Sequence, residues 1–207
     1  MEITKGCRQE SASGPGLWNL QFNSLLNLEF TKNAKVIAYA DAVLILTKGK
    51  AQEEVESYAN IELNKVTTWA RENKMVFKEN KSKLMIITRS GPKTKRDYKM
   101  YLNNKQLRQE NTIKYLGIII DRRFNFNAHV EYTMRKCIRL IHALSKSAKF
   151  NWGLRHDVLR IIYSGAILPI SSYGAQVWED SLQRNCKYLT SELKRIQRLV
   201  NIKVAKA

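Results

Sequence analysis

Acidic residues, cysteines and long apolar runs are all scarce in this sequence of 207 residues. It contains 18 Asp and Glu residues against 36 Lys and Arg residues, which gives a formal net charge of +18 at pH 7. This excess favours a polyanionic partner, with nucleic acid the leading candidate. Hydrophobic residues still make up 44% of the chain, so the composition predicts a folded core rather than disorder.

The three cysteines, Cys7, Cys137 and Cys186, are odd in number and far apart. They indicate neither a disulfide framework nor a zinc site, and they fit a reducing compartment. The N-terminal segment MEITKGCRQE has no apolar signal core, and no segment approaches the ~18 apolar residues of a transmembrane helix. We therefore expect an intracellular protein with no membrane partner. The sequence leaves nucleus or cytoplasm open, and also the oligomeric state.

The spacing of apolar residues predicts an α+β first part and an all-helical last third. One helix of about four turns is expected to begin at Ser13–Pro15 and to carry the apolar residues Leu17, Leu20, Leu25 and Leu28. Other helices are expected over 52–73, 131–150, 155–164, 166–178 and 191–204. Strand segments are expected at 36–46 (a hairpin), 84–88, 100–107 (a hairpin turning at Asn103 and Asn104) and 113–120 (a buried strand). The boundary falls near 122–127.

The hairpin at 36–46 reads VIAYADAVLIL, two apolar runs separated at Asp41. An acid at the tip of a buried hairpin is a frequent location for metal-dependent phosphoryl chemistry. That chemistry needs several carboxylates converging on two Mg²⁺ ions, and Asp41 is the only acid of this segment. From spacing alone, an ordinary core hairpin with an aspartate in its turn is the better interpretation.

The residues of this hairpin nevertheless resemble a known family. YADAVLIL (39–46) is similar to the YADD-type catalytic box of reverse transcriptases. Four further blocks extend the resemblance in the family's order: GCRQESASGPGLWNLQFNSLL (6–26), WARENKMVFKENKSK (69–83), IKYLGIIID (113–121) and GAILPISSYGAQVWE (165–179). Together they resemble the RNA-directed DNA polymerases of insect non-LTR, LINE-type retrotransposons, of the jockey and related groups, over nearly the whole chain.

This resemblance implies a partial polymerase palm at 1–123, an antiparallel sheet with packed helices, followed by an all-α thumb-like region at 124–207. It implies RNA and DNA, as a template–primer duplex, for partners and Mg²⁺ for the family's cofactor. Asp41 would be the remnant of the catalytic box and a Mg²⁺ ligand. Residues Gln9, Ser11, Tyr39 and Lys81 would contact the template or nucleotide. Tyr115, Leu116 and Gly117 would form the turn of the primer-grip hairpin.

Three departures from the family pattern predict that this chain alone has no polymerase activity. The second aspartate of the box is replaced by Ala42. Glu10 replaces the family glycine between Gln9 and Ser11, which adds bulk and negative charge. We also expect the fingers and the upstream palm strand, which carries another essential aspartate, to be missing. One carboxylate is too few to orient two metal ions, so Mg²⁺ is not expected to bind productively.

Residues 131–150, with Val130 just before them, carry two parallel stripes. The apolar stripe repeats every three or four residues, as the buried face of a helix does, and contains Val130, Met134, Cys137, Ile141, Leu144 and Ala148. A basic stripe lies about 100° round the helix and contains Arg135, Arg139, His142, Lys146 and Lys149. Because no acidic partner is evident along it, contact with a nucleic-acid backbone is favoured over a merely solvated surface.

Three functional hypotheses remain open. The chain is a truncated, inactive reverse-transcriptase fragment, a non-catalytic nucleic-acid-binding protein that reuses the palm and thumb, or a working polymerase whose missing carboxylates come from another chain. Primer-extension assays separate the third hypothesis from the other two. Salt-dependent binding separates the second from a fragment that cannot fold.

Overall fold

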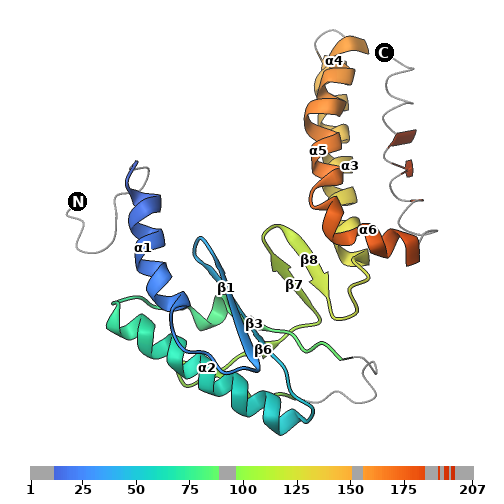
Figure 1. The fold of residues 1–207 in the computed structure, drawn as a ribbon. Coiled ribbons are helices and arrows are strands. Elements are labelled where there is room, and N and C mark those ends of the chain that lie inside the picture. Colours follow the sequence, from blue (N-terminus) through green and yellow to red (C-terminus); the bar gives the residue numbers. More distant parts are fainter. Residues whose placement is uncertain are drawn as a thin grey trace. The chain divides into compact units, whose positions relative to one another are not determined.

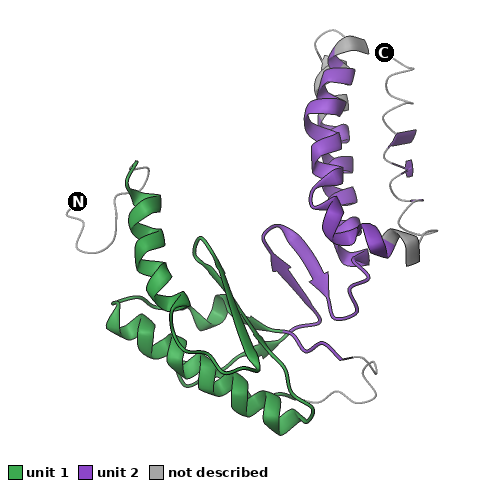
Figure 2. Cartoon of the chain, viewed as in Figure 1, with its two compact units in different colours: residues 1–84, 94–109 green, residues 85–93, 110–207 purple. Residues whose placement is uncertain are grey.

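A computed structural model describes residues 12–88, 97–150 and 156–184, together with Ser191, Lys194, Arg195, Gln197 and Arg198. Over these residues the fold is α+β, as the sequence predicts. The chain divides into two compact units, residues 1–84 with 94–109 and residues 85–93 with 110–207 (Figure 2). The predicted domains, 1–123 and 124–207, stay a prediction.

Two helices and a hairpin build the first unit, and Figure 1 shows them beside one another. Helix α1 (Gly14–Leu26) begins with a proline in its first turn, where the missing N–H has no intrahelical partner to lose. Helix α2 (Gln52–Glu72) has acids in its first turn, where the helix dipole favours them. Strand β1 (Ala34–Tyr39) pairs antiparallel with β2 (Ala42–Thr47). Both predicted helices and the hairpin are confirmed.

An aromatic cluster holds α1 and α2 against one face of this hairpin. Its buried members are Phe22, Leu25, Val66, Trp69 and Ala70. The Trp69 ring stands edge-on to Phe22 with centroids 5.7 Å apart, and its Nε1 donates to Ser24 Oγ at 2.9 Å. Of the apolar residues of α1, Leu25 is buried, whereas Leu17 and Leu20 are 51% and 73% exposed. The larger Phe22 ring takes the inward position, where it removes more apolar area from water.

A buried carboxylate ties the loop before β1 to α2. Glu62 is fully buried, accepts a hydrogen bond from the Thr31 N–H at 2.9 Å and pairs with Lys65 at 3.2 Å. Burial alone would raise the pKa of Glu62, but hydrogen bonds from Thr31 and Lys65 outweigh it and lower the pKa. Lys65 Nζ also donates to the Glu29 carbonyl at 2.7 Å. These bonds fix where the chain enters the hairpin.

The remaining strands of the first unit are short. Strands β4 (Tyr101–Leu102) and β5 (Lys105–Gln106) form the predicted hairpin, and Asn103 and Asn104 at its turn have φ of 50° and 62°. Strand β3 (Lys83–Leu84) covers only the start of the predicted 84–88 and pairs parallel with β6 (Arg108–Gln109). The predicted antiparallel sheet is confirmed in part, because the described strands form separate two-stranded pairs that are antiparallel except for β3 with β6.

The second unit begins with another hairpin. The predicted single strand at 113–120 is wrong, because β7 (Thr112–Tyr115) and β8 (Ile118–Asp121) pair antiparallel about a turn at Leu116 and Gly117. These two residues have φ of 46° and 84°, as a type I′ turn requires. Leucine rarely adopts positive φ, so the apolar run IKYLGIII gives no ordinary turn signal.

Helices complete the second unit. They are α3 (Asn127–Phe150), α4 (His156–Ile162), a π-helical turn η2 (Tyr163–Ile167), α5 (Leu168–Ser172) and α6 (Ala175–Arg184). Val130, Met134, Cys137 and Ile141 form a buried cluster with Ile167, which confirms the apolar stripe of α3 as far as Ile141. The side chains of Leu144 and Ala148 lie outside the described residues.

The sequence predicts one helix ending at residue 164 and another beginning at residue 166. In the structure the π-helical turn η2 continues the helical backbone across this point. The helical run ends instead after α5, before Gly174, whose φ is +65°. Of the predicted helix at 191–204, the structure describes Ser191, Lys194, Arg195, Gln197 and Arg198, all helical. Among the helices of the described residues, none has the length and apolar character that spanning a membrane requires.

Candidate functional site

Asp41 lies in the two-residue turn between β1 and β2, exposed to solvent. Its neighbour Ala40 has φ of 51°, a conformation that non-glycine residues rarely adopt. The Ala40 carbonyl accepts a hydrogen bond from Trp18 Nε1 at 2.9 Å, so α1 holds the turn. Tyr39 pairs with Ala42 across the last rung and is 63% exposed. The turn therefore presents Tyr39 and Asp41 to solvent in a position set by Trp18.

The donor set at this turn does not fit a two-metal site. Asp41 is the only carboxylate of the hairpin, and Ala42 offers no ligand at the position where the resemblance implies a second aspartate. In the described part of the chain, no group of three His, Cys, Asp or Glu side chains could hold a metal ion. Two Mg²⁺ ions need several converging oxygen ligands, and the described residues do not supply them.

Lys81 lies at the end of the short 3₁₀-helix η1 (Glu79–Lys81) and is exposed. The β4–β5 hairpin holds this helix, because Asn103 Nδ2 donates to Glu79 Oε1 at 2.6 Å and Lys105 Nζ donates to Asn80 Oδ1 at 3.0 Å. Gln9 and Ser11 lie outside the described residues. The template- or nucleotide-binding roles of Gln9, Ser11, Tyr39 and Lys81 stay predictions.

Leu116 and Gly117, which with Tyr115 make up the predicted primer grip, form the exposed β7–β8 turn. The structure brings this turn against Tyr173, which follows α5. Tyr173 Oη donates to the Leu116 carbonyl at 2.9 Å, and a Cβ built on Gly117 would lie 3.0 Å from Tyr173 Cε1. Sequence reasoning missed this contact, although the Tyr-Gly pair in GAILPISSYGAQVWE is a helix-ending signal that marks the place.

A buried histidine lies beneath the same hairpin. His129, in the first turn of α3, is 3% exposed. Its Nδ1 accepts a hydrogen bond from the Ile119 N–H at 3.3 Å, and the ring also bonds to the Tyr173 backbone. Burial lowers the pKa of His129 below its ordinary value, and the bond to Tyr173 offsets only part of that effect. His129 is therefore neutral near pH 7.

We expect the free energy of unfolding to fall as the pH drops below about 6.5, the ordinary pKa of histidine. In that range the unfolded chain binds a proton at His129 that the folded chain excludes, so acid favours unfolding. Urea unfolding between about pH 5 and 8 measures this effect. His129→Gln should flatten the pH dependence, whereas His142→Gln, at an exposed position of the same helix, should retain it. Equal profiles for the two variants would contradict this role of His129.

The structure describes part of the basic stripe on α3. Arg135, Arg139 and His142 are exposed, and the side chains of Lys146 and Lys149 lie outside the described residues. The prediction that the stripe has no acidic partner is wrong, because Glu131 pairs with Arg135 one turn away. Both side chains are exposed, so this pair contributes only about 0–1 kcal/mol to stability, but it reduces the charge at that end of the stripe.

Basic residues from two elements lie near Tyr132 on α3, and sequence reasoning missed the one that comes from β7. Lys114 Nζ, from β7, donates to Tyr132 Oη at 3.2 Å and lies 4.8 Å from the centre of its ring. The pKa of Tyr132 is lowered by this hydrogen bond first and by the charge of Lys114 next, with smaller contributions from Lys136 and Arg139. We call Lys114, Tyr132, Lys136 and Arg139 the Tyr132 cluster. It joins a strand and a helix into one positively charged surface.

A comparison with protein families matches residues 1–120 to the family described as "Reverse transcriptase (RNA-dependent DNA polymerase)". No solved structure matches the chain.

Among curated proteins, the chain is 29% identical over 199 residues to a "Retrovirus-related Pol polyprotein from type-1 retrotransposable element R1" of Bradysia coprophila, covering 96% of this chain and 20% of that protein. It is 28% identical to an R1 Pol polyprotein of Nasonia vitripennis, covering 86% of this chain and 44% of that protein. It is 26% identical to a "Probable RNA-directed DNA polymerase from transposon X-element" of Drosophila melanogaster, covering 96% of this chain and 22% of that protein. The chain thus spans less than half the length of these relatives.

Proposed function

We propose a nucleic-acid-binding function for this chain, which belongs to the reverse transcriptase (RNA-dependent DNA polymerase) family. Its curated relatives are non-LTR retrotransposon polyproteins of insects. The proposed ligand is a template–primer duplex of RNA and DNA, bound through its phosphates. In this proposal residues 1–123 are part of a polymerase palm and residues 124–207 are a thumb-like region.

The Tyr132 cluster is the observation that carries this proposal. Lys114 donates to the partly exposed Tyr132 hydroxyl, and the charges of Lys136 and Arg139, one and two turns further along α3, act on the same phenol. A phosphodiester can accept hydrogen bonds from these cations, and the Tyr132 ring can contact a sugar or a base edge. Such contacts carry little base identity, so they suit a protein that follows a backbone of any sequence.

We also propose that this chain alone does not catalyse polymerisation. The support is the tip of the β1–β2 hairpin, where Asp41 stands without the second carboxylate of the family's box, because residue 42 is alanine. An intracellular location is part of the same proposal, because a template–primer duplex is found inside cells.

Salt titration of binding tests the proposed function. Fluorescence anisotropy of a labelled RNA–DNA duplex is measured with the purified chain at increasing NaCl. Three phosphate contacts predict that affinity falls roughly 40-fold between 50 and 200 mM salt, since each contact contributes about −0.9 to the logarithmic slope. A duplex of scrambled sequence should bind equally well. Far-UV circular dichroism of the same sample controls for folding, and a folded chain whose affinity does not change with salt would contradict the proposal.

A further inference from the structure

We propose that Tyr173 and Gly174, which connect α5 to α6, clamp the β7–β8 turn and that Tyr173 is its positioning residue. This inference depends on the proposed function for one point, namely that nucleic acid is the ligand of the turn. The clamp joins two sequence blocks that lie far apart in the chain, KYLGI and SSYGA. Within the second unit it fixes the hairpin that carries Lys114 relative to the helices.

The first half of the clamp is the tyrosine side chain. Its hydroxyl donates to the Leu116 carbonyl at 2.9 Å, at the tip of the turn. Its ring lies directly over Gly117, where even a Cβ atom would come within 3.0 Å of Cε1. Gly117 also has φ of +84°, so this position needs glycine both for its backbone and for the close approach of the ring.

The second half is the glycine that follows. Gly174 has φ of +65°, and a Cβ built on it would lie 2.6 Å from Ile118 Cδ1, the residue after the turn. Tyr173 and Gly174 therefore each contact one of two successive hairpin residues, Gly117 and Ile118. The pairing is reciprocal, because a larger residue at either glycine displaces a side chain of the other segment.

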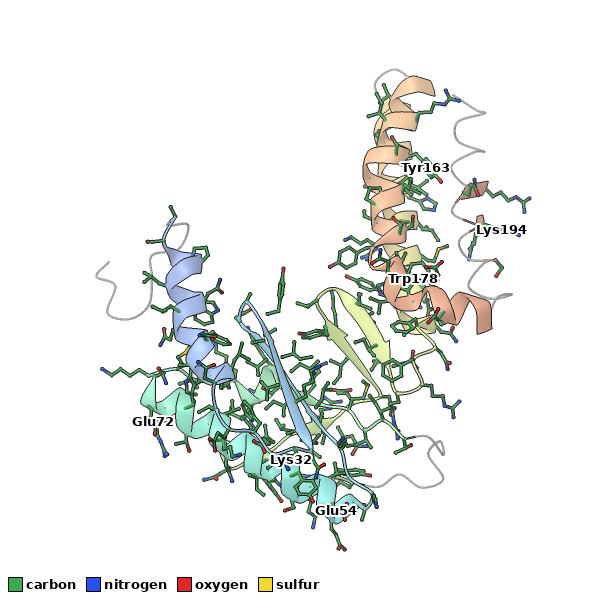
Figure 3. The ribbon with its side chains drawn as sticks, viewed as in Figure 1. Lys32, Glu54, Glu72, Tyr163, Trp178 and Lys194 are labelled. Carbon is green, nitrogen blue, oxygen red and sulfur yellow. The ribbon has the colours of Figure 1, made fainter. Side chains whose placement is uncertain are left out.

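The backbone of Tyr173 is itself held in place. Its carbonyl accepts a hydrogen bond at 3.1 Å from Nε1 of Trp178, a residue labelled in Figure 3. His129 bonds to the same backbone. His129 also accepts the Ile119 N–H at 3.3 Å. One buried histidine thus connects the clamp segment to strand β8.

The clamp fixes the position of the β7–β8 turn but buries little apolar surface. Tyr173 is 54% exposed and Leu116 is 41% exposed, so their contact removes little apolar area from water. Its consequence is that the turn, with Lys114 close to it on β7, keeps a constant place relative to Lys136 and Arg139 on α3. A duplex would then meet a prearranged surface and would not have to order the turn on binding.

Hydrogen–deuterium exchange of the free protein tests the clamp without any ligand. Tyr173→Phe keeps the ring and removes the hydroxyl, and we expect about three- to tenfold faster exchange over residues 116–119. Tyr101→Phe, at a 42% exposed tyrosine of the first unit, is the matched control and should leave that segment unchanged. Unchanged exchange in Tyr173→Phe would overturn the proposal.

Two substitutions together test the contact between the ring and Gly117. Gly117→Ala alone should speed exchange of the turn, because its new methyl meets the Tyr173 ring and its φ is strained. In a Tyr173→Ala background the clash disappears, so the added effect of Gly117→Ala should be clearly smaller than in the wild type. Strictly additive effects would contradict the clamp.

Binding separates the clamp from the proposed function. Tyr173→Phe should weaken duplex binding about three- to tenfold and leave the salt slope unchanged, because the hydroxyl carries no charge. If the wild type binds no duplex but Tyr173→Phe still speeds local exchange, the clamp stands and the proposed function falls. If the wild type binds and Tyr173→Phe changes neither readout, the clamp falls and the binding function stands.

Discussion

Replacing Lys114, Lys136 and Arg139 by glutamate is expected to lower the affinity for an RNA–DNA duplex by about two to three orders of magnitude at 50 mM salt. The charges of all three cations act on Tyr132, and each lost phosphate contact removes about 0.9 from the logarithmic salt slope. The slope should therefore fall by about 2.7 together with the affinity. Anisotropy titrations at several NaCl concentrations measure both quantities on the same samples.

A matched variant separates this local effect from a loss of net charge. Lys32, Lys48 and Lys50 are exposed lysines of the first unit, and Lys32 is labelled in Figure 3. Their replacement by glutamate changes the net charge as much as the triple substitution in the Tyr132 cluster does. We expect this control to weaken binding only severalfold through the general field of the protein. An equal loss in both variants would show that no particular surface binds the duplex.

The positions of the turns show what the sequence alone could predict. Asn103 and Asn104 tolerate positive φ, so their hairpin could be placed from residue type. The turn at Leu116 and Gly117 could not, because an apolar run of this kind is typical of a buried strand. Only the resemblance to the reverse-transcriptase block suggested a turn there. The structural reason for it, the Tyr173 ring over Gly117, lies in a segment far along the chain.

The candidate binding surface was predictable in part for a similar reason. Helical spacing placed Arg135 and Arg139 on one exposed stripe, and the structure confirms their exposure. Lys114 could not be added to that stripe from periodicity, because it reaches Tyr132 from a different element. The pairing of Glu131 with Arg135 was readable at a spacing of four residues and was overlooked. Contacts within a helix follow from spacing, whereas contacts between elements require the fold.

The purified chain is expected to show no extension of a primed template above the background without protein, even with Mg²⁺ and all four deoxynucleotides. Phosphoryl transfer by two metal ions needs carboxylates that hold both ions against the substrate phosphates. In the β1–β2 hairpin only Asp41 can contribute, from an exposed turn held by Trp18 through the Ala40 carbonyl. A single ligand leaves the positions of two ions undetermined. A gel-based extension assay, with an active reverse transcriptase as the positive control, measures the outcome.

The variant Ala42→Asp shows whether residue 42 alone accounts for the inactivity. It restores the second carboxylate of the box on the strand that pairs with Tyr39. We expect it to remain inactive, because among the described residues no further acidic side chains gather with Asp41 into a group that could hold a metal ion. Extension by Ala42→Asp but not by the wild type would mean that the ligand set lacks only residue 42. Mg²⁺-dependent extension by the wild-type chain would contradict the proposed inactivity, and it would mean that Asp41 acts with ligands beyond those the β1–β2 hairpin provides.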